Sequence, residues 1–143
     1  MQGPSQHALD DLFEAAKAVR EKAHAPYSRF KVGAAIRGRS GKIYPGCNVE
    51  NAAYPVGACA EGGAISLMVA SGESAIAEIL VLGWTDAHPD APGLTTPCGG
   101  CRQRIREFAA PDTPIHIAGP EGIRRSFTLD ELLPESFGPE NLG

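Results

Sequence analysis

The sequence has no long hydrophobic run and no excess of positive charge. No stretch of about 18 apolar residues occurs, so no segment is expected to span a membrane. Residues 1–10 lack a basic region followed by an apolar one, so we expect no signal peptide. Thirteen Lys and Arg against 17 Asp and Glu give a net charge of -4, which makes nucleic acid a poor partner. These absences predict a cytoplasmic protein that binds neither membranes nor nucleic acid.

Cysteine is also scarce, with four residues in the chain. Without an export signal, cysteines point to metal binding or catalysis rather than to disulfides, although two disulfides remain the alternative. The length of 143 residues and a hydrophobic fraction of 43% suit one folded domain, residues 1–143, with a real core.

Hydrophobic periodicity predicts an alternation of helices and strands. Helices are expected at residues 8–23, 59–70 and 98–108, and strands at 30–37, 42–49, 76–84 and 114–118. Residues 119–125 suggest a turn, 126–128 an extended piece, and the capping box of Thr128 and Glu131 a short last helix. Pro45 places the second strand at an edge or at a bulge. The helix at 59–70 is apolar nearly all round and is expected to be buried. This order predicts an α/β fold, a three-layer α/β/α sandwich around a mixed sheet.

Two short motifs bring three cysteines and one carboxylate together. The first is Gly57-Ala58-Cys59-Ala60-Glu61-Gly62-Gly63, and the second is Thr96-Pro97-Cys98-Gly99-Gly100-Cys101-Arg102. Three thiolates can hold one zinc ion and leave its fourth position open, which is typical of a catalytic site. We therefore predict zinc, one ion per chain, bound by Cys59, Cys98 and Cys101, with Glu61 as the catalytic acid–base group. The alternatives are buried cysteines without metal, or a structural site with Cys47 as fourth ligand; a free cysteine inside a strand is more often a small hydrophobic side chain.

Further motifs make the chain resemble the small homotetrameric cytidine deaminases from about residue 10 to residue 142. They are Pro26-Tyr27-Ser28-Arg29-Phe30, Gly46-Cys47-Asn48-Val49-Glu50-Asn51 and Leu132-Leu133-Pro134-Glu135-Ser136-Phe137. The resemblance implies that Glu61 shuttles protons and that Asn48 and Glu50 bind a ribose hydroxyl. It also implies that the backbone of Ala60 reads the pyrimidine and that Phe30 lies beside the base. Phe137 and Tyr54 would contact the site of a neighbouring subunit.

One position departs from the pattern of that family. Three-cysteine members usually carry Arg directly after the catalytic Glu, where this chain has Gly62. That Arg offsets the negative charge of zinc with three thiolates, so another cation is expected to replace it here, and Arg102 is the candidate. Blasticidin-type deaminases also lack the Arg, but they do not share Asn48-Val49-Glu50-Asn51.

The leading hypothesis for function is hydrolytic deamination of cytidine and deoxycytidine, a step of pyrimidine salvage. The alternative, motivated by Gly62, is deamination of a modified or antibiotic aminopyrimidine nucleoside. A non-catalytic zinc-stabilised binding module is a third possibility, but a structural zinc site would have no use for Glu61. A nucleic-acid editor is disfavoured by the acidic charge.

Overall fold

The computed structural model describes residues 3–143, so residues 1–2 of the predicted domain lie outside it. The elements are α1 (Gly3–Arg20), β1 (Phe30–Gly38), β2 (Ile43–Cys47), η1 (Tyr54–Val56), α2 (Ala60–Ala70), β3 (Ile76–Thr85), α3 (Gly99–Phe108), β4 (Pro114–Gly119), β5 (Gly122–Thr128), α4 (Leu129–Leu132) and η2 (Pro139–Asn141). No helix within residues 3–143 has both the length and the apolar character needed to cross a membrane.

The five strands form one mixed sheet in the order β2-β1-β3-β4-β5. β1 pairs antiparallel with β2 and with β3, β3 pairs parallel with β4, and β4 pairs antiparallel with β5. The prediction of a mixed sheet is confirmed, as is the edge position of the strand that contains Pro45. An edge suits Pro45, because proline cannot donate a hydrogen bond to a second neighbour.

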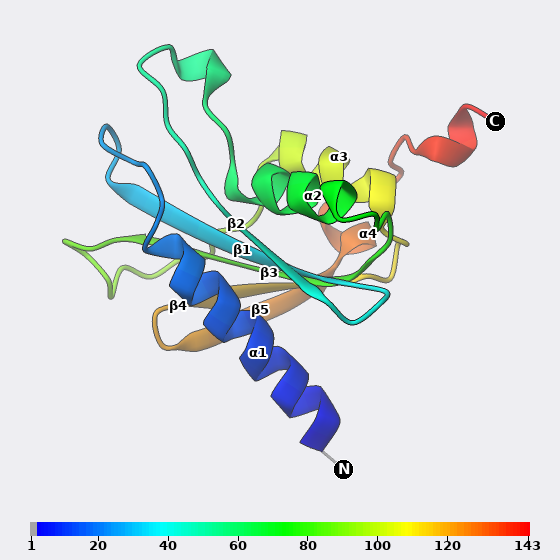
Figure 1. Cartoon of the computed structure of the whole chain (residues 1–143), viewed down its shortest axis with the longest axis horizontal. Helices are drawn as coiled ribbons and strands as arrows, with labels where there is room; N and C mark the ends of the chain where they lie inside the picture. Colours follow the sequence, from blue (N-terminus) through cyan, green and yellow to red (C-terminus); the bar gives the residue numbers. More distant parts are fainter. Residues whose placement is uncertain (1–2) are drawn as a thin grey trace.

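Helices cover both faces of this sheet. Figure 1 shows α1 crossing the sheet apart from α2 and α3, which lie together. The side of α1 has a smaller core that includes Leu12, Leu80 and Leu82. The side of α2 and α3 has a larger core that includes Met68, Ile79 and Ile105. The three-layer prediction is therefore confirmed, and β3 is the central strand with apolar side chains on both faces.

The C-terminal part of the chain differs from the prediction. Residues 119–125 were expected to form a turn, but the turn is shorter and β5 already begins at Gly122. Gly122 has a φ of 145°, which permits this tight reversal. Arg124 and Arg125 interrupt the apolar alternation that would have predicted this strand. Such charges are usual on an edge strand because they discourage pairing with other chains. The capping box of Thr128 and Glu131 is present at the start of α4.

Helix α2 is less covered than its composition predicts. Ala64, Ile65 and Met68 are buried against the sheet. Leu67 and Val69, however, are 43% and 47% exposed in the single chain. The expected burial is thus met on the side that faces the sheet and not on the other.

Candidate active site

The three motif cysteines lie at the starts of two neighbouring helices, as the sequence predicts. Cys59 is the N-cap of α2, Cys98 is the N-cap of α3, and Cys101 lies in the first turn of α3. The Sγ atoms of Cys59 and Cys101 are 2.7 Å apart. Helix N-termini carry a partial positive charge, so both helices favour thiolates at this point.

Close packing of α2 on the edge strand fixes the position of Cys59. A Cβ on Gly46 of β2 would lie 2.5 Å from the carbonyl oxygen of Ala60, and closer still to the amide nitrogen of Ala64. Only glycine allows this approach of strand and helix, because any other side chain would push the first turn of α2 away. Gly46 therefore helps to set the distance between the two helix starts.

Cys59, Glu61 and Cys101 form a group that can hold a metal ion. Their ligand atoms all lie within 4.8 Å of one another. Cys98 is exposed and lies outside this tight group, although it lines the same cavity. All four cysteines, which lie within the described residues 3–143, are free thiols in the structure. Thiolates with a nearby carboxylate are a donor set that suits zinc.

The pKa values of Glu61, Cys59 and Cys101 shift in different directions. Burial raises the pKa of Glu61, which is only 5% exposed, and the neighbouring Cys59 adds to this shift. The pKa of Cys59 is lowered, first by the hydrogen bond with Cys101 and then by the backbone N–H of Gly62 and the charge of Arg104. The pKa of Cys101 is raised because it keeps the shared proton and is buried. A carboxylic acid with a raised pKa is suited to general acid–base work near neutral pH.

A cavity of about 640 Å³ opens above these side chains. This volume is in the range of small-molecule sites. Its lining combines the metal group with the loop after β2 and the segment before α3: Tyr27, Ser28, Val32, Asn48, Val49, Glu50, Asn51, Tyr54, Gly57, Ala58, Cys59, Ala60, Glu61, Thr95, Thr96, Cys98 and Cys101.

Comparison with known proteins places this arrangement in a family. Residues 6–117 match the model of the cytidine and deoxycytidylate deaminase zinc-binding region. The chain belongs to this deaminase family. A cytidine deaminase from Sporosarcina psychrophila is 37% identical over 94% of this chain and 94% of its own length. The crystal structure of cytidine deaminase from Burkholderia pseudomallei has a TM-score of 0.80 and 43% identity, covering 90% of this chain and 98% of that chain. Cytidine deaminase from Mycobacterium tuberculosis has a TM-score of 0.73 and 32% identity, over 90% and 96% of the two chains.

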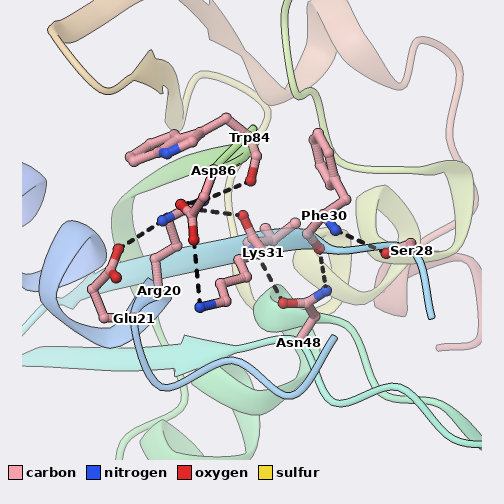
Figure 2. Close-up of polar contacts among 9 residues, drawn as sticks. Arg20, Glu21, Ser28, Phe30, Lys31, Asn48, Trp84 and Asp86 are labelled. Atoms are coloured by element: carbon pink, nitrogen blue, oxygen red, sulfur yellow. Dashed lines mark hydrogen bonds and ion pairs between the residues drawn. The ribbon is translucent and has the colours of Figure 1, made fainter. Parts of the chain in front are cut away.

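Two residues that the deaminase resemblance assigns to ribose binding, Asn48 and Glu50, lie in the cavity wall and also organise it. The Asn48 amide donates to the carbonyl of Phe30 at 2.9 Å (Figure 2). It also accepts from the N–H of Val32 at 2.9 Å. Glu50 accepts hydrogen bonds from the N–H groups of Tyr27 and Ser28 and from the Ser28 hydroxyl. These bonds lower the pKa of Glu50, the Ser28 hydroxyl most of all. Both side chains therefore tie β1 and the loop before it to the rim of the cavity.

A buried arginine holds the other side of the same strand. Arg20 is 1% exposed and its Nε donates to the carbonyl of Lys31 at 3.2 Å. Its guanidinium also lies 3.8 Å from the centre of the Trp84 ring and pairs with Asp86 at 2.9 Å, as Figure 2 shows. The start of β1 is thus fixed from both sides, by Arg20 at Lys31 and by Asn48 at Phe30 and Val32.

Of the remaining predicted substrate contacts, Ala60 and Tyr54 line the cavity, whereas Phe30 and Phe137 do not. Ala60 is buried in the cavity wall, and Tyr54 lines the rim with its ring 6.2 Å from that of Tyr27. Phe30 and Phe137 are not among the lining residues of this chain's own cavity; they are 37% and 57% exposed. Cys47 lies on β2, paired with Gly33, and likewise does not line the cavity.

The structure also shows site residues that the sequence analysis missed. Thr95 and Thr96 line the cavity, and their place directly before Pro97 and Cys98 was an available signal. Arg104 Nη1 lies 3.8 Å from Cys59 Sγ and 3.6 Å from Cys101 Sγ. The expectation that Arg102 is the cation beside the thiols is wrong. Its guanidinium donates to the carbonyls of Pro97 and Leu132 and to the Thr96 hydroxyl.

Proposed function

We propose that this protein deaminates cytidine and deoxycytidine by hydrolysis, forming uridine or deoxyuridine and ammonia. The observation that carries the proposal is the buried Glu61 carboxyl, grouped with the Cys59 and Cys101 thiols at the floor of a cavity. A structural zinc site does not need a buried carboxyl beside its cysteines, whereas a deaminase needs one to move protons.

Cys59 and Cys101, with Cys98 as the third thiol, would hold the zinc ion. When bound with one open position, zinc supplies Lewis acidity, which makes water nucleophilic at neutral pH. The helix starts that carry the cysteines favour the thiolate form that metal binding requires.

Glu61 transfers the protons of the reaction. Burial raises the pKa of this carboxyl above that of an ordinary glutamate, which makes it better able to take up a proton and pass it on. It donates a proton to N3 of the cytosine ring and later delivers one to the departing amine. Water is consumed, the C4–N bond breaks, and the oxygen of that water remains as the C4 carbonyl.

The cavity wall positions the nucleoside. Asn48 and Glu50 bind the ribose hydroxyl and the Ala60 backbone faces the pyrimidine; the resemblance to the deaminases and the place of these residues in the cavity lining support both roles. The resemblance alone supports Phe30 beside the base, because Phe30 does not line this chain's own cavity. Asn48 retains hydrogen-bonding capacity, because an amide has two donor hydrogens and two acceptor lone pairs and the contacts with β1 use one of each.

The protein is further proposed to act as a cytoplasmic homotetramer, with Tyr54 and Phe137 reaching the sites of neighbouring subunits. Exposed apolar side chains support an assembly. Tyr54 and Val56 of η1 are 76% and 66% exposed, and Leu142 near the C-terminus is 81% exposed. Figure 1 shows the C-terminal segment, in red, projecting away from the sheet. Apolar groups gathered on such projections are typical of contact surfaces.

The test is ultraviolet monitoring of the purified protein with cytosine, cytidine, deoxycytidine and cytidine monophosphate. We expect conversion of the two nucleosides, with equimolar ammonia, and little change of the free base or the monophosphate. No conversion of either nucleoside by zinc-loaded protein would overturn the proposal. Conversion only of an antibiotic aminopyrimidine nucleoside added to the same panel would support the alternative substrate.

A further inference from the structure

Arg104 is a cation that the proposed reaction leaves without a role. It follows Cys101 by three residues on α3, so both side chains lie on the same face of the helix. Nη1 is 3.6 Å from Cys101 Sγ and 3.8 Å from Cys59 Sγ, so one guanidinium contacts both thiols. Within residues 3–143, the structure gives Arg104 no ion pair with a carboxylate.

Two glycines leave the space that this guanidinium occupies. A Cβ on Gly62 would lie 3.8 Å from Arg104 Cδ and 3.2 Å from Cys59 Sγ. A Cβ on Gly100 would lie 3.3 Å from Arg104 Nη1 and 3.9 Å from Cys98 Sγ. Larger side chains at either position would compete with Arg104 for the surface over the thiols.

The other arginines of α3 are engaged elsewhere. Arg102 donates to the carbonyls of Pro97 and Leu132. Arg106 is bonded to the Ser136 hydroxyl and to the Glu140 carboxylate. Of the three, Arg104 alone directs its charge at the sulfur atoms.

Zinc binding requires the cysteines as thiolates, and a zinc ion held by three thiolates keeps one net negative charge on its sulfur atoms. A fixed positive charge beside the sulfurs therefore favours the loaded site. We propose that Arg104 is the charge-balancing residue of the metal centre, acting through Cys59 and Cys101 from the space that Gly62 and Gly100 leave open. This inference rests on the proposed function, because it requires those thiols to be zinc ligands.

Arg104 is exposed, so its effect is moderate and depends on salt. A charge pair at about 4 Å in well-solvated surroundings corresponds to roughly a fivefold change in an equilibrium constant, and more where water is partly excluded. Mobile ions screen such exposed pairs. Arg104 is a positioning residue in this sense: it stabilises the ligands and does not touch the substrate.

The test compares zinc retention in the full-length holoprotein at pH 6.5 against a chromophoric chelator. Arg104→Gln removes the charge, Arg104→Lys keeps it, and Arg125→Gln is a control on the exposed side of β5. We expect Arg104→Gln to hold zinc about five- to tenfold more weakly, while Arg104→Lys and Arg125→Gln stay within about twofold of the wild type. The difference should shrink when the salt concentration is raised from about 0.05 M to about 0.5 M.

A double variant tests whether the charge of Arg104, rather than the shape of its side chain, maintains zinc retention. In the double variant Gly62→Arg with Arg104→Gln, a cation approaches the thiols from α2 instead of α3, and zinc retention should recover to within about twofold of the wild type. A cobalt-substituted sample gives an independent signature. Loss of the cation should shift the thiolate-to-metal charge-transfer band of Arg104→Gln to longer wavelength, and a purely structural role would leave that band in place.

The outcomes distinguish the two proposals. Wild-type protein without zinc, or Cys101→Ala with full zinc, would overturn the metal site and this inference together. Stoichiometric zinc in the wild type, with equal chelator resistance and an unshifted cobalt band in Arg104→Gln, would overturn the role of Arg104 alone. If Arg104→Gln failed to fold, the wild type alone would still provide a test. Zinc retention by the wild type that did not change with salt concentration would overturn the role of Arg104.

Discussion

Cys101 is the most deeply placed of the three motif cysteines. Its side chain is fully buried, whereas Cys59 is half-buried and Cys98 exposed. Its thiol contacts Cys59 and belongs to the group that can hold a metal. Solvent cannot replace a ligand in this position without opening the start of α3. Loss of Cys101 should therefore weaken zinc binding more than loss of an exposed ligand.

We predict that Cys101→Ala retains less than about one tenth of the zinc of the wild type, since two thiols hold zinc much more weakly than three. Metal analysis of the purified protein measures this. Cys47→Ala is the matched control, because Cys47 lies on β2 away from the cavity lining, and it should keep its zinc. Full zinc in Cys101→Ala would remove that residue from the site.

At the scale of elements, the contact between β2 and α2 is the tightest link between the sheet and the site. We predict that Gly46→Ala lowers the free energy of unfolding by about 1 to 3 kcal/mol, because the added methyl group meets the backbone of Ala60 and Ala64. Deamination should fall as well, since the first turn of α2 carries Cys59 and Glu61. Urea unfolding and activity are the measurements.

Gly99→Ala is the control for that variant. A Cβ on Gly99 has open space around it, and alanine suits a helix better than glycine does. It should leave stability unchanged or raise it. If the two variants unfolded at the same urea concentration, close packing at Gly46 would not be what positions α2.

A polar ladder crosses the face of the sheet that α1 covers. Glu78 Oε2 accepts from Arg37 Nε at 3.1 Å, and Glu78 Oε1 lies 3.0 Å from His116 Nε2. His116 Nδ1 in turn lies 2.7 Å from the hydroxyl of Ser126. The hydrogen bond with His116, followed by that with Arg37, lowers the pKa of Glu78.

A lowered pKa in the folded state stabilises the protein above the ordinary pKa of a glutamate, about 4.3, and this gain is lost as pH falls through the lower folded value. We predict that Glu78→Gln lowers the free energy of unfolding by about 1 to 3 kcal/mol at pH 7. The difference from the wild type should shrink below about pH 4. Urea unfolding across this pH range tests it, with the exposed Glu107→Gln as control. A cost that stayed constant with pH would contradict an electrostatic origin.

At the scale of the whole molecule, the uncovered side of α2 is the feature that a single chain explains least. Leu67 and Val69 are exposed on a helix whose composition predicts burial all round. We predict that wild-type protein elutes as a homo-oligomer and that Leu67→Glu, which places a charge on this side, lowers the oligomeric state. Light scattering coupled to size exclusion measures both. The control is Ser74→Glu, which places the same charge at an exposed position in the loop after α2. A fully active wild-type monomer would contradict the assembly.

Much of the fold could be read from the sequence because its signals are local. Alternation predicted β1, the apolar run predicted the central β3, and Thr128 with Glu131 predicted the start of α4. Only residues 126–128 of strand β5 were predicted as extended, because Arg124 and Arg125 interrupt the apolar pattern of this edge strand. The uncovered side of α2 could not be seen either, because composition does not say whether another chain covers a helix.

The site follows the same division. The sequence predicted one metal site for Cys59, Cys98 and Cys101; the structure groups Cys59 and Cys101 with Glu61, and Cys98 lines the same cavity outside that group. Arg104 and the roles of Asn48 and Glu50 in holding β1 depend on contacts between distant segments, which no local pattern reports. The choice of Arg102 failed because its reach toward Leu132 depends on where α4 ends.

The central claim is that Glu61 performs the proton transfers at a zinc site built by the cysteines. Glu61→Gln keeps the size of the side chain and removes its ability to exchange a proton. Zinc content and the rate of cytidine deamination should be measured on the same preparation, beside the wild type. We predict unchanged zinc and a loss of activity of about 100- to 10,000-fold, as expected when general acid–base catalysis is removed. A zinc-loaded Glu61→Gln protein that deaminates cytidine at the wild-type rate would contradict the claim.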